Sequence, residues 1–251
     1  MFICFDLDDT LLNKKKEVSE YTLKVLNECK KKGHKLIINT ARGHHATFDL
    51  IDLIKPDYSV VNAGALIYDN NLDVVYDNPI SVDIVNKVIE RIKDNASIIT
   101  IQAYSGLYTT NTKSLNELAK VIDVTKGVDY DAYKIIPRDL DYNLAMSVKE
   151  EFDLDYCVYF NGAWSRFCNS GVTKLSGLKK IVEIENANMA DTISFGDDLG
   201  DIEMLMGSGI GVCMENSVSD VLEKVKIVTK SCDDDGVAVY LNKYLNLGIE
   251  K

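Results

Sequence analysis

Short apolar runs alternate with amphipathic segments in the first and last thirds of the chain. The runs at residues 2–5, 35–39 and 192–196 are of the kind that forms fully buried strands. Between the first two runs, Ser19 precedes a segment whose apolar side chains recur at helical spacing, and a basic run ending in glycine closes that segment. Repeated strand–helix units of this kind predict a parallel sheet with helices on both faces.

The remaining periodic segments fit the same architecture. Residues 65–78 read as a hairpin with its turn at Asn70–Asn71. We expect further strands over residues 58–64, 209–214 and 226–230, and further helices over residues 44–54, 173–188, 201–207, 217–225 and 236–245.

The middle of the chain departs from this alternation. The pattern there predicts a helix with Val82, Val85 and Ile89 on one side, strands over residues 97–104 and 157–160, and a helix near residues 115–121. A connection this long between two core strands is far longer than an ordinary loop. We therefore predict an α/β protein with a Rossmann-like core of residues 1–79 and 165–251, and an inserted α+β domain of residues 80–164.

Composition narrows the class of protein. The 251 residues are 46% apolar and 27% charged, as in a globular domain, and the formal net charge is −11. Such a charge argues against a nucleic-acid or anionic-membrane partner, because both require a basic surface. No run reaches the roughly 18–20 apolar residues of a membrane span, and the N-terminus lacks a signal-peptide pattern. The six cysteines are scattered without a CxxC pair, which favours reduced thiols and a cytoplasmic protein.

Polar side chains follow the predicted strands at the edge where open α/β sheets bind ligands. In an extended segment Asp6 and Asp8 are two positions apart and would share one face. A cluster of carboxylate oxygens without His or Cys suits Mg²⁺, and such a cation with one lysine would offset the gathered negative charge. The candidate side chains are Asp6, Asp8, Thr40, Lys174, Asp197, Asp198 and Asp201, of which Asp198 is expected to cap a turn.

Four short motifs carry a resemblance to a known family. "DLDDT" at residue 6, "NTAR" at residue 39, "GVTK" at residue 171 and "GDDLGD" at residue 196 stand in this order along the chain. Together they resemble the four motifs of the haloacid dehalogenase superfamily of phosphatases. The insertion between the second and third motifs, with "NAGALIYD" and "DDDGVAVYL", resembles the large-capped, Cof-type branch.

The resemblance implies a phosphatase acting on small phosphorylated metabolites, such as sugar phosphates or phosphorylated cofactors. Asp6 would be the nucleophile that forms an aspartyl-phosphate. Asp8 would protonate the leaving oxygen and then help water attack the intermediate. Thr40 and the backbone N–H of Ala41 would hold phosphate oxygens, and Lys174 would neutralise charge.

The resemblance also implies a Mg²⁺ site. Its ligands would be the Asp6 carboxylate, the Asp8 backbone carbonyl and Asp197, with Asp201 holding the site from behind. The chain departs from the family pattern at Gly200, where this branch usually carries an Asn that orients phosphate. A milder departure is "TAR" in place of the commoner "TGR".

Three alternatives stay open at this stage. A phosphomutase would use the same aspartyl-phosphate but return the phosphate to its substrate. A non-catalytic binder of phosphorylated metabolites is conceivable because of Gly200. A phospho-accepting receiver module also combines acids, a hydroxyl and a lysine on a parallel sheet, but it needs only about half this length.

Overall fold

The computed structural model describes residues 1–113, 119–159 and 164–251. The chain divides into two compact units, one formed by Met1–Tyr76 with Thr173–Lys251 and the other by Asp77–Val172. The second unit extends beyond residues 80–164, the predicted insertion, at both ends. Residues after Trp164 form a strand of the second unit's sheet and do not return directly to the first unit.

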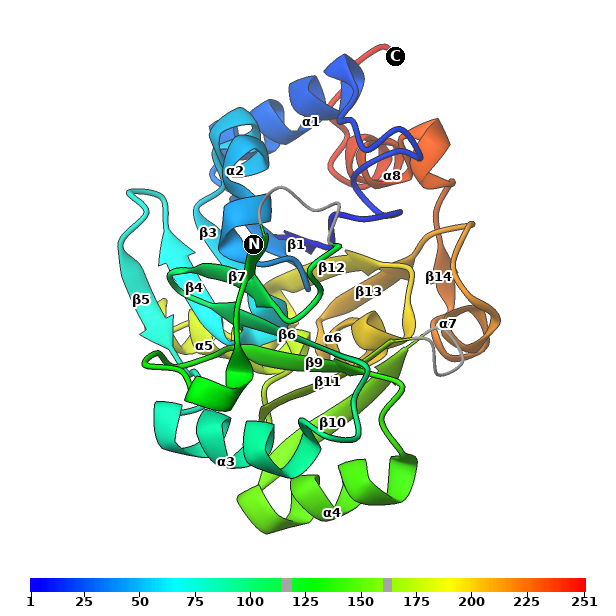
Figure 1. Cartoon of the computed structure of the whole chain (residues 1–251). Helices are drawn as coiled ribbons and strands as arrows, with labels where there is room; N and C mark the ends of the chain where they lie inside the picture. The colour runs from blue at the N-terminus through cyan, green and yellow to red at the C-terminus, as the bar shows by residue number, and fades with distance from the viewer. Residues whose placement is uncertain (114–118, 160–163) are drawn as a thin grey trace. The chain divides into compact units, whose positions relative to one another are not determined.

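The first unit contains an eight-stranded sheet in the order β14-β13-β12-β1-β2-β3-β4-β5 (Figure 1). The strands from β14 to β3 pair in parallel, whereas β3 and β4 are antiparallel. The bounds are β1 Phe2–Phe5, β2 Lys35–Asn39, β3 Tyr58–Val61, β4 Leu66–Asp69, β5 Val74–Asp77, β12 Thr192–Gly196, β13 Ile210–Cys213 and β14 Ile227–Val228. The parallel core and the hairpin of β4 and β5 confirm the predicted strands.

Helices cover both faces of this sheet because its central strands are apolar on both sides. Ile3 and Phe5 of β1 pack in one cluster with residues of α1, α2 and α8, while Cys4 packs in another with residues of α5 and α6. The helices of this unit are α1 Glu20–Lys31, α2 Phe48–Ile54, α5 Lys174–Ile184, α6 Ile202–Gly207, α7 Ser219–Lys224 and α8 Gly236–Tyr244.

The helix ends show why these segments are helical. Ser19 caps α1 by accepting a 3.0 Å hydrogen bond from the N–H of Thr22, as its position in the sequence predicts. Thr173 and Ser176 form a capping box at the start of α5. Short 3₁₀ turns complete the loops: η1 His44–Ala46, η2 Asn62–Gly64, η5 Met189–Asp191, η6 Leu199–Asp201 and η7 Cys232–Asp234. The helix predicted for residues 44–54 is thus divided into η1 and α2.

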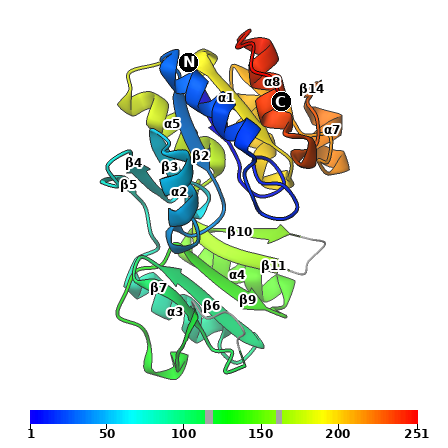
Figure 2. The same cartoon turned by 90° about the horizontal axis from the view of Figure 1, so that it is seen from above.

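The second unit contains a six-stranded sheet in the order β10-β11-β9-β6-β7-β8. Figure 2 labels all of these strands except β8. The apolar cluster of this unit joins one face of the sheet to helices α3 and α4. The elements are α3 Val82–Ile92, β6 Ile98–Ala103, β7 Gly106–Thr109, β8 Ala119–Val121, η3 Val124–Lys126, β9 Lys134–Arg138, α4 Tyr142–Phe152, β10 Leu154–Tyr159 and β11 Trp164–Asn169. The helix expected near residues 115–121 is wrong at 119–121, which form β8, and residues 114–118 lie outside the described chain.

Two properties of the whole chain accompany this fold. Within the described residues, no helix has the length and apolar character needed to cross a membrane. All six cysteines are free thiols, and all but Cys157 are buried.

Candidate active site

Two neighbouring strands bring buried carboxylates together at their carboxyl ends. Asp6 follows β1 and Asp197 follows β12, and the N–H of Asp6 donates a 3.1 Å hydrogen bond to the carbonyl of Phe195. Oxygens of Asp6, Asp197 and Asp201 lie within 4.8 Å of one another, and all three residues are buried. The expectation that strand ends converge on one acidic site therefore fits the geometry of these three side chains.

Lys174 is the cation at the centre of this cluster. Its Nζ lies 2.8 Å from Oδ1 of Asp6 and 2.5 Å from Oδ1 of Asp201. It is the first residue of α5, and Asn39 at the end of β2 fixes that helix start by donating a 2.8 Å hydrogen bond to the Lys174 carbonyl. A single buried lysine thus touches two of the three acids.

The cluster combines three acidic side chains with one basic side chain. Burial raises the pKa of Asp6, and Asp201 adds to this effect while Lys174 opposes it. Burial also raises the pKa of Asp197 to about 8, with Asp6 and Asp201 acting in the same direction. Burial disfavours the Lys174 ammonium, but Asp201 and Asp6 raise the pKa of Lys174 above its ordinary value. Three buried carboxylates around one ammonium are an oxygen donor set suited to a hard divalent cation.

Asp201 uses both of its oxygens within the protein. Oδ1 faces Lys174, while Oδ2 accepts hydrogen bonds from the N–H groups of Asp197 and Asp198 at 3.0 and 3.1 Å. Asp198 in turn accepts from the N–H of Leu199 and caps η6, as predicted for a turn residue. Asp201 therefore shapes the loop that presents Asp197.

Thr10 is a site residue that sequence reasoning did not assign a role. Its Oγ1 donates a 2.6 Å hydrogen bond to Oδ1 of Asp197. The residue is buried and closes the "DLDDT" motif, so its place in that motif was the available indication.

Asp8 does not join the buried cluster through its carboxylate. The side chain pairs with Arg42, whose Nε and Nη2 lie 2.7 Å from Oδ2 and Oδ1, and with Lys16, whose Nζ lies 3.0 Å from Oδ1. Burial opposes ionisation, but hydrogen bonds from Arg42 and Lys16 lower the pKa of Asp8. The prediction that Asp6 and Asp8 share one face assumed an extended segment, whereas β1 ends at Phe5 and the chain turns directly after it.

Thr40 and Ala41 lie in the loop that follows β2, the strand that pairs with β1. Thr40 is buried, its N–H donates to the carbonyl of Val60 at 2.9 Å, and its Oγ1 accepts from the N–H of Arg42 at 3.1 Å. Ala41 is exposed. The loop is further held by a 2.9 Å hydrogen bond from the N–H of Ala63 to the Thr40 carbonyl.

Gly200 lies inside η6, one residue before Asp201. Its φ is not in the left-handed region, and a Cβ placed on it would meet nothing within 4 Å. The backbone of this turn therefore imposes no requirement for glycine.

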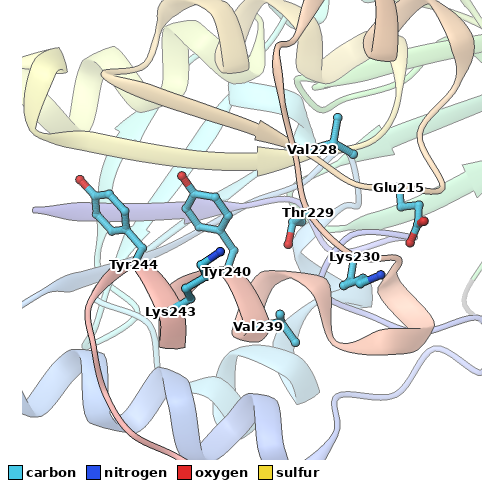
Figure 3. Close-up of a pocket in the computed structure, with 8 residues that line it drawn as sticks. All are labelled: Glu215, Val228, Thr229, Lys230, Val239, Tyr240, Lys243 and Tyr244. Atoms are coloured by element: carbon cyan, nitrogen blue, oxygen red, sulfur yellow. The ribbon is translucent and has the colours of Figure 1, made fainter.

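A surface groove of about 630 Å³ lies elsewhere in the first unit, beside β14 and α8 (Figure 3). Two tyrosines, Tyr240 and Tyr244, stack at its wall, and Lys230 and Lys243 reach into the same region. None of the acidic residues described above lines it. The groove is therefore separate from the acidic site.

Comparison with known proteins places this geometry in context. The sequence model described as haloacid dehalogenase-like hydrolase matches residues 3–241. A 5-amino-6-(5-phospho-D-ribitylamino)uracil phosphatase of Bacillus subtilis, YitU, is 24% identical over 98% of this chain and 97% of its own. A pyridoxal phosphate phosphatase of Escherichia coli, YbhA, is 24% identical over 97% of this chain and 98% of its own.

Solved structures show the same fold. A haloacid dehalogenase-like hydrolase from Bacteroides thetaiotaomicron superposes with a TM-score of 0.83 at 20% identity, covering 97% of this chain and 98% of that chain. The predicted fold class, an α/β core with an additional α+β unit, is thereby confirmed.

Proposed function

Because this chain belongs to the family of haloacid dehalogenase-like hydrolases, we propose that it is a Mg²⁺-dependent phosphatase that works through an aspartyl-phosphate on Asp6. Its class, a hydrolase of phosphoric monoesters, follows from the family match together with relatives that are named as phosphatases. The reaction path, the metal and the substrates are the proposed parts.

The observation that carries the proposal is the contact between Asp6 and Lys174. A carboxylate with an ammonium 2.8 Å from one oxygen keeps its other oxygen for attack on phosphorus. Phosphoryl transfer depends on positioning and charge neutralisation, and a buried lysine beside Asp6 supplies positive charge and holds the carboxylate in place. In the proposed reaction Asp6 attacks the phosphoryl group, and Lys174 neutralises charge on Asp6 and on the phosphate.

The donor set around Asp6 supports a divalent cation. The proposed ligands are the Asp6 carboxylate, the Asp8 backbone carbonyl and Asp197, while Asp201 holds the loop of Asp197 from behind. When bound, Mg²⁺ would supply positive charge next to the transferred phosphate. All the proposed ligand atoms are oxygens, as a hard cation requires.

The remaining steps use residues beside the cluster. Asp8 protonates the ester oxygen as it leaves and later accepts a proton from the attacking water. The Thr40 hydroxyl and the Ala41 N–H hold phosphate oxygens in the loop after β2. These roles come from the resemblance of the motifs, and the positions of the residues at the strand ends support them.

The proposed substrates are small phosphorylated metabolites, either sugar phosphates or phosphorylated cofactors. Support comes from the printed names of two relatives, one acting on a phosphoribityl compound and the other on pyridoxal phosphate. We also propose a cytoplasmic location, which the six free thiols support.

A single screen tests the proposal. Purified protein is incubated with Mg²⁺ and a panel of sugar phosphates and phosphorylated cofactors, and release of inorganic phosphate is measured. The matched control is Asp6→Asn, which keeps the size of the side chain but removes the nucleophile. Isomerised phosphoester without free phosphate would indicate a phosphomutase, and absence of turnover above the control would refute the proposed function.

A further inference from the structure

We propose that Arg42 is a positioning residue that aims the carboxylate of Asp8 at the leaving oxygen of the substrate. The inference rests on the proposed function, because it assigns a task to Asp8 within that reaction. It concerns a contact that the motif pattern alone does not specify.

The side chains of Arg42 and Asp8 form a bidentate ion pair. Nε and Nη2 of Arg42 each lie 2.7 Å from a different oxygen of Asp8. A planar guanidinium paired in this way with both oxygens fixes the plane of the carboxylate as well as its position. An Asp8 held by one bond would still rotate about its terminal torsion, which is broad for a carboxylate.

Arg42 is itself firmly held. Its N–H donates to Oγ1 of Thr40 at 3.1 Å, and its carbonyl accepts from the N–H of Asn62 at 2.8 Å. Asn62 and the following Ala63 both have left-handed backbone angles, with φ of 54° and 58°. Such conformations cost free energy in residues other than glycine and persist where the surrounding structure imposes them. The turn of η2 therefore fixes the backbone from which Arg42 reaches Asp8.

Lys16 also contacts Asp8 but orients its carboxylate less strongly than Arg42 does. Its Nζ makes one contact at 3.0 Å and a second, at 3.4 Å, with Asp9. The lysine side chain is 48% exposed against 25% for Arg42, so solvent screens its interaction more. An ammonium is also a point charge on a flexible stem and cannot fix the carboxylate plane. Arg42 is therefore the residue assigned to orientation.

The chemistry gives this orientation a specific consequence. In the first step Asp8, which Arg42 and Lys16 hold as a carboxylate in the free protein, takes up a proton from solvent. An oxygen of Asp6 then bonds to phosphorus, the ester P–O bond breaks, and the leaving oxygen takes that proton from Asp8. In the second step water bonds to phosphorus and loses its proton to Asp8, and the Asp6–phosphorus bond breaks to release phosphate. An alkoxide leaves poorly unless it is protonated, whereas nitrophenolate leaves without a proton. A misaligned Asp8 should therefore lower kcat/KM for alkyl esters more than for nitrophenyl esters.

The test compares kcat/KM for two substrates in wild type and Arg42→Lys. The substrates are p-nitrophenyl phosphate and the best alkyl phosphate of the screen, and kcat/KM is used because it includes departure of the leaving group. Arg42→Lys keeps the positive charge but loses the planar pair of N–H donors that contacts both oxygens of Asp8. We expect kcat/KM to fall about 10- to 100-fold on the alkyl ester and no more than about threefold on the nitrophenyl ester.

Three controls isolate the role of orientation. Arg91→Lys makes the same exchange at an ion pair with Glu151 in the second unit and should change neither rate. Lys16→Met should lower the alkyl rate less than Arg42→Lys does. In an Asp8→Ala background, Arg42→Lys should change the ratio of the two rates no further, because the effect is transmitted through Asp8.

The outcomes are separable. Equal losses on both esters in Arg42→Lys, or an undiminished effect in the Asp8→Ala background, would overturn the inference while leaving the phosphatase proposal intact. Arg42→Gln serves as a second variant, and unfolding of both variants would assign Arg42 to the fold and also overturn the inference. A wild-type protein inactive on every ester would instead refute the proposed function and this inference with it.

Discussion

The hydroxyl of Thr10 donates a 2.6 Å hydrogen bond to Oδ1 of Asp197, and this bond ties the loop after β1 to the loop after β12. Asp197 has two carboxylate oxygens, and the bond occupies one lone pair of Oδ1 in a fixed direction. The carboxylate is thereby turned relative to Asp6, with which it forms the candidate metal site. In the proposed enzyme a hydroxyl in this position would act as an outer-shell partner of the metal ligand Asp197.

Replacing Thr10 with Val removes this hydroxyl while keeping the branched shape of the side chain. Because outer-shell partners typically contribute about 10- to 100-fold to metal affinity, Thr10→Val should raise the Mg²⁺ concentration needed for half-maximal activity by about that factor. Thr10→Ser, which keeps the hydroxyl, is the matched control. A Thr10→Val protein with an unchanged Mg²⁺ requirement would show that Asp197 is oriented by other contacts.

Replacing Asp6 with Asn should abolish turnover and leave the fold intact. The amide is close in size but is a poor nucleophile and a weaker ligand for a hard cation. Lys174 retains its 2.5 Å contact with Asp201, so the buried ammonium keeps a partner and no large loss of stability is expected. Phosphate release and the melting temperature are measured on the same preparation. Retention of more than about a tenth of the wild-type rate would contradict covalent catalysis by Asp6.

The parallel core was predictable because its information is local. Each buried strand of the first unit is an apolar run, and caps such as Ser19 mark where helices begin. The order of the elements then leaves few alternatives to a parallel sheet covered on both faces.

The second unit was harder to predict because polar residues interrupt the apolar ones along its strands. In β11, Ser165 and Phe167 point to one face while Arg166 and Cys168 point to the other, so no apolar run identifies the strand. Residue 164 is the last of the predicted insertion, yet it begins β11 of the second unit's sheet. Helix α4 was not predicted at all, and β8 falls in a segment interpreted as a helix.

The same distinction applies to the candidate site. The ends of the parallel strands predicted the neighbourhood of Asp6 and Asp197, and Lys174 joins them from the start of α5. The direction of the Asp8 side chain depends on a turn after Phe5 and on Arg42, which lies 34 positions away. Contacts between distant loops leave no periodic pattern, so the partners of Asp8 could not be read from the sequence.

The stability of the metal-free protein should fall as pH rises from about 4 to about 8. Burial raises the pKa of Asp197 from 3.8 to about 8, so in this window the folded state holds a proton that the unfolded state has lost. Stability then decreases with pH, because the folded state binds more protons. The expected result is a lower melting temperature at pH 8 than at pH 6 in the presence of a chelator.

Two comparisons attribute this trend to Asp197. In Asp197→Asn the fall between pH 6 and pH 8 should be smaller, because the titrating carboxyl is gone. Added Mg²⁺ should stabilise the wild-type protein more at pH 8 than at pH 6, because a cation binds only the ionised carboxylates. An equal decline in wild type and Asp197→Asn would show that other groups cause the pH dependence.

Replacing Gly200 with Asn should raise kcat/KM. The resemblance places at this position an amide that orients phosphate, and the chain lacks it without losing the nucleophile, the acids or Lys174. One preorganised donor is typically worth about 3 kcal/mol, or roughly a hundredfold in rate, so an enzyme without it still works and has room to gain. A requirement for left-handed backbone would oppose the change, but Gly200 does not occupy that region and an added Cβ meets nothing within 4 Å.

Gly200→Ala is the matched control, because it shares the loss of backbone freedom, worth about 0.5–1 kcal/mol, without supplying a donor. A gain in Gly200→Asn that exceeds the gain in Gly200→Ala, measured on the best substrate of the screen, would assign the effect to the amide. A well-folded Gly200→Asn enzyme whose kcat/KM does not exceed that of Gly200→Ala would contradict the idea that a missing amide limits phosphate binding.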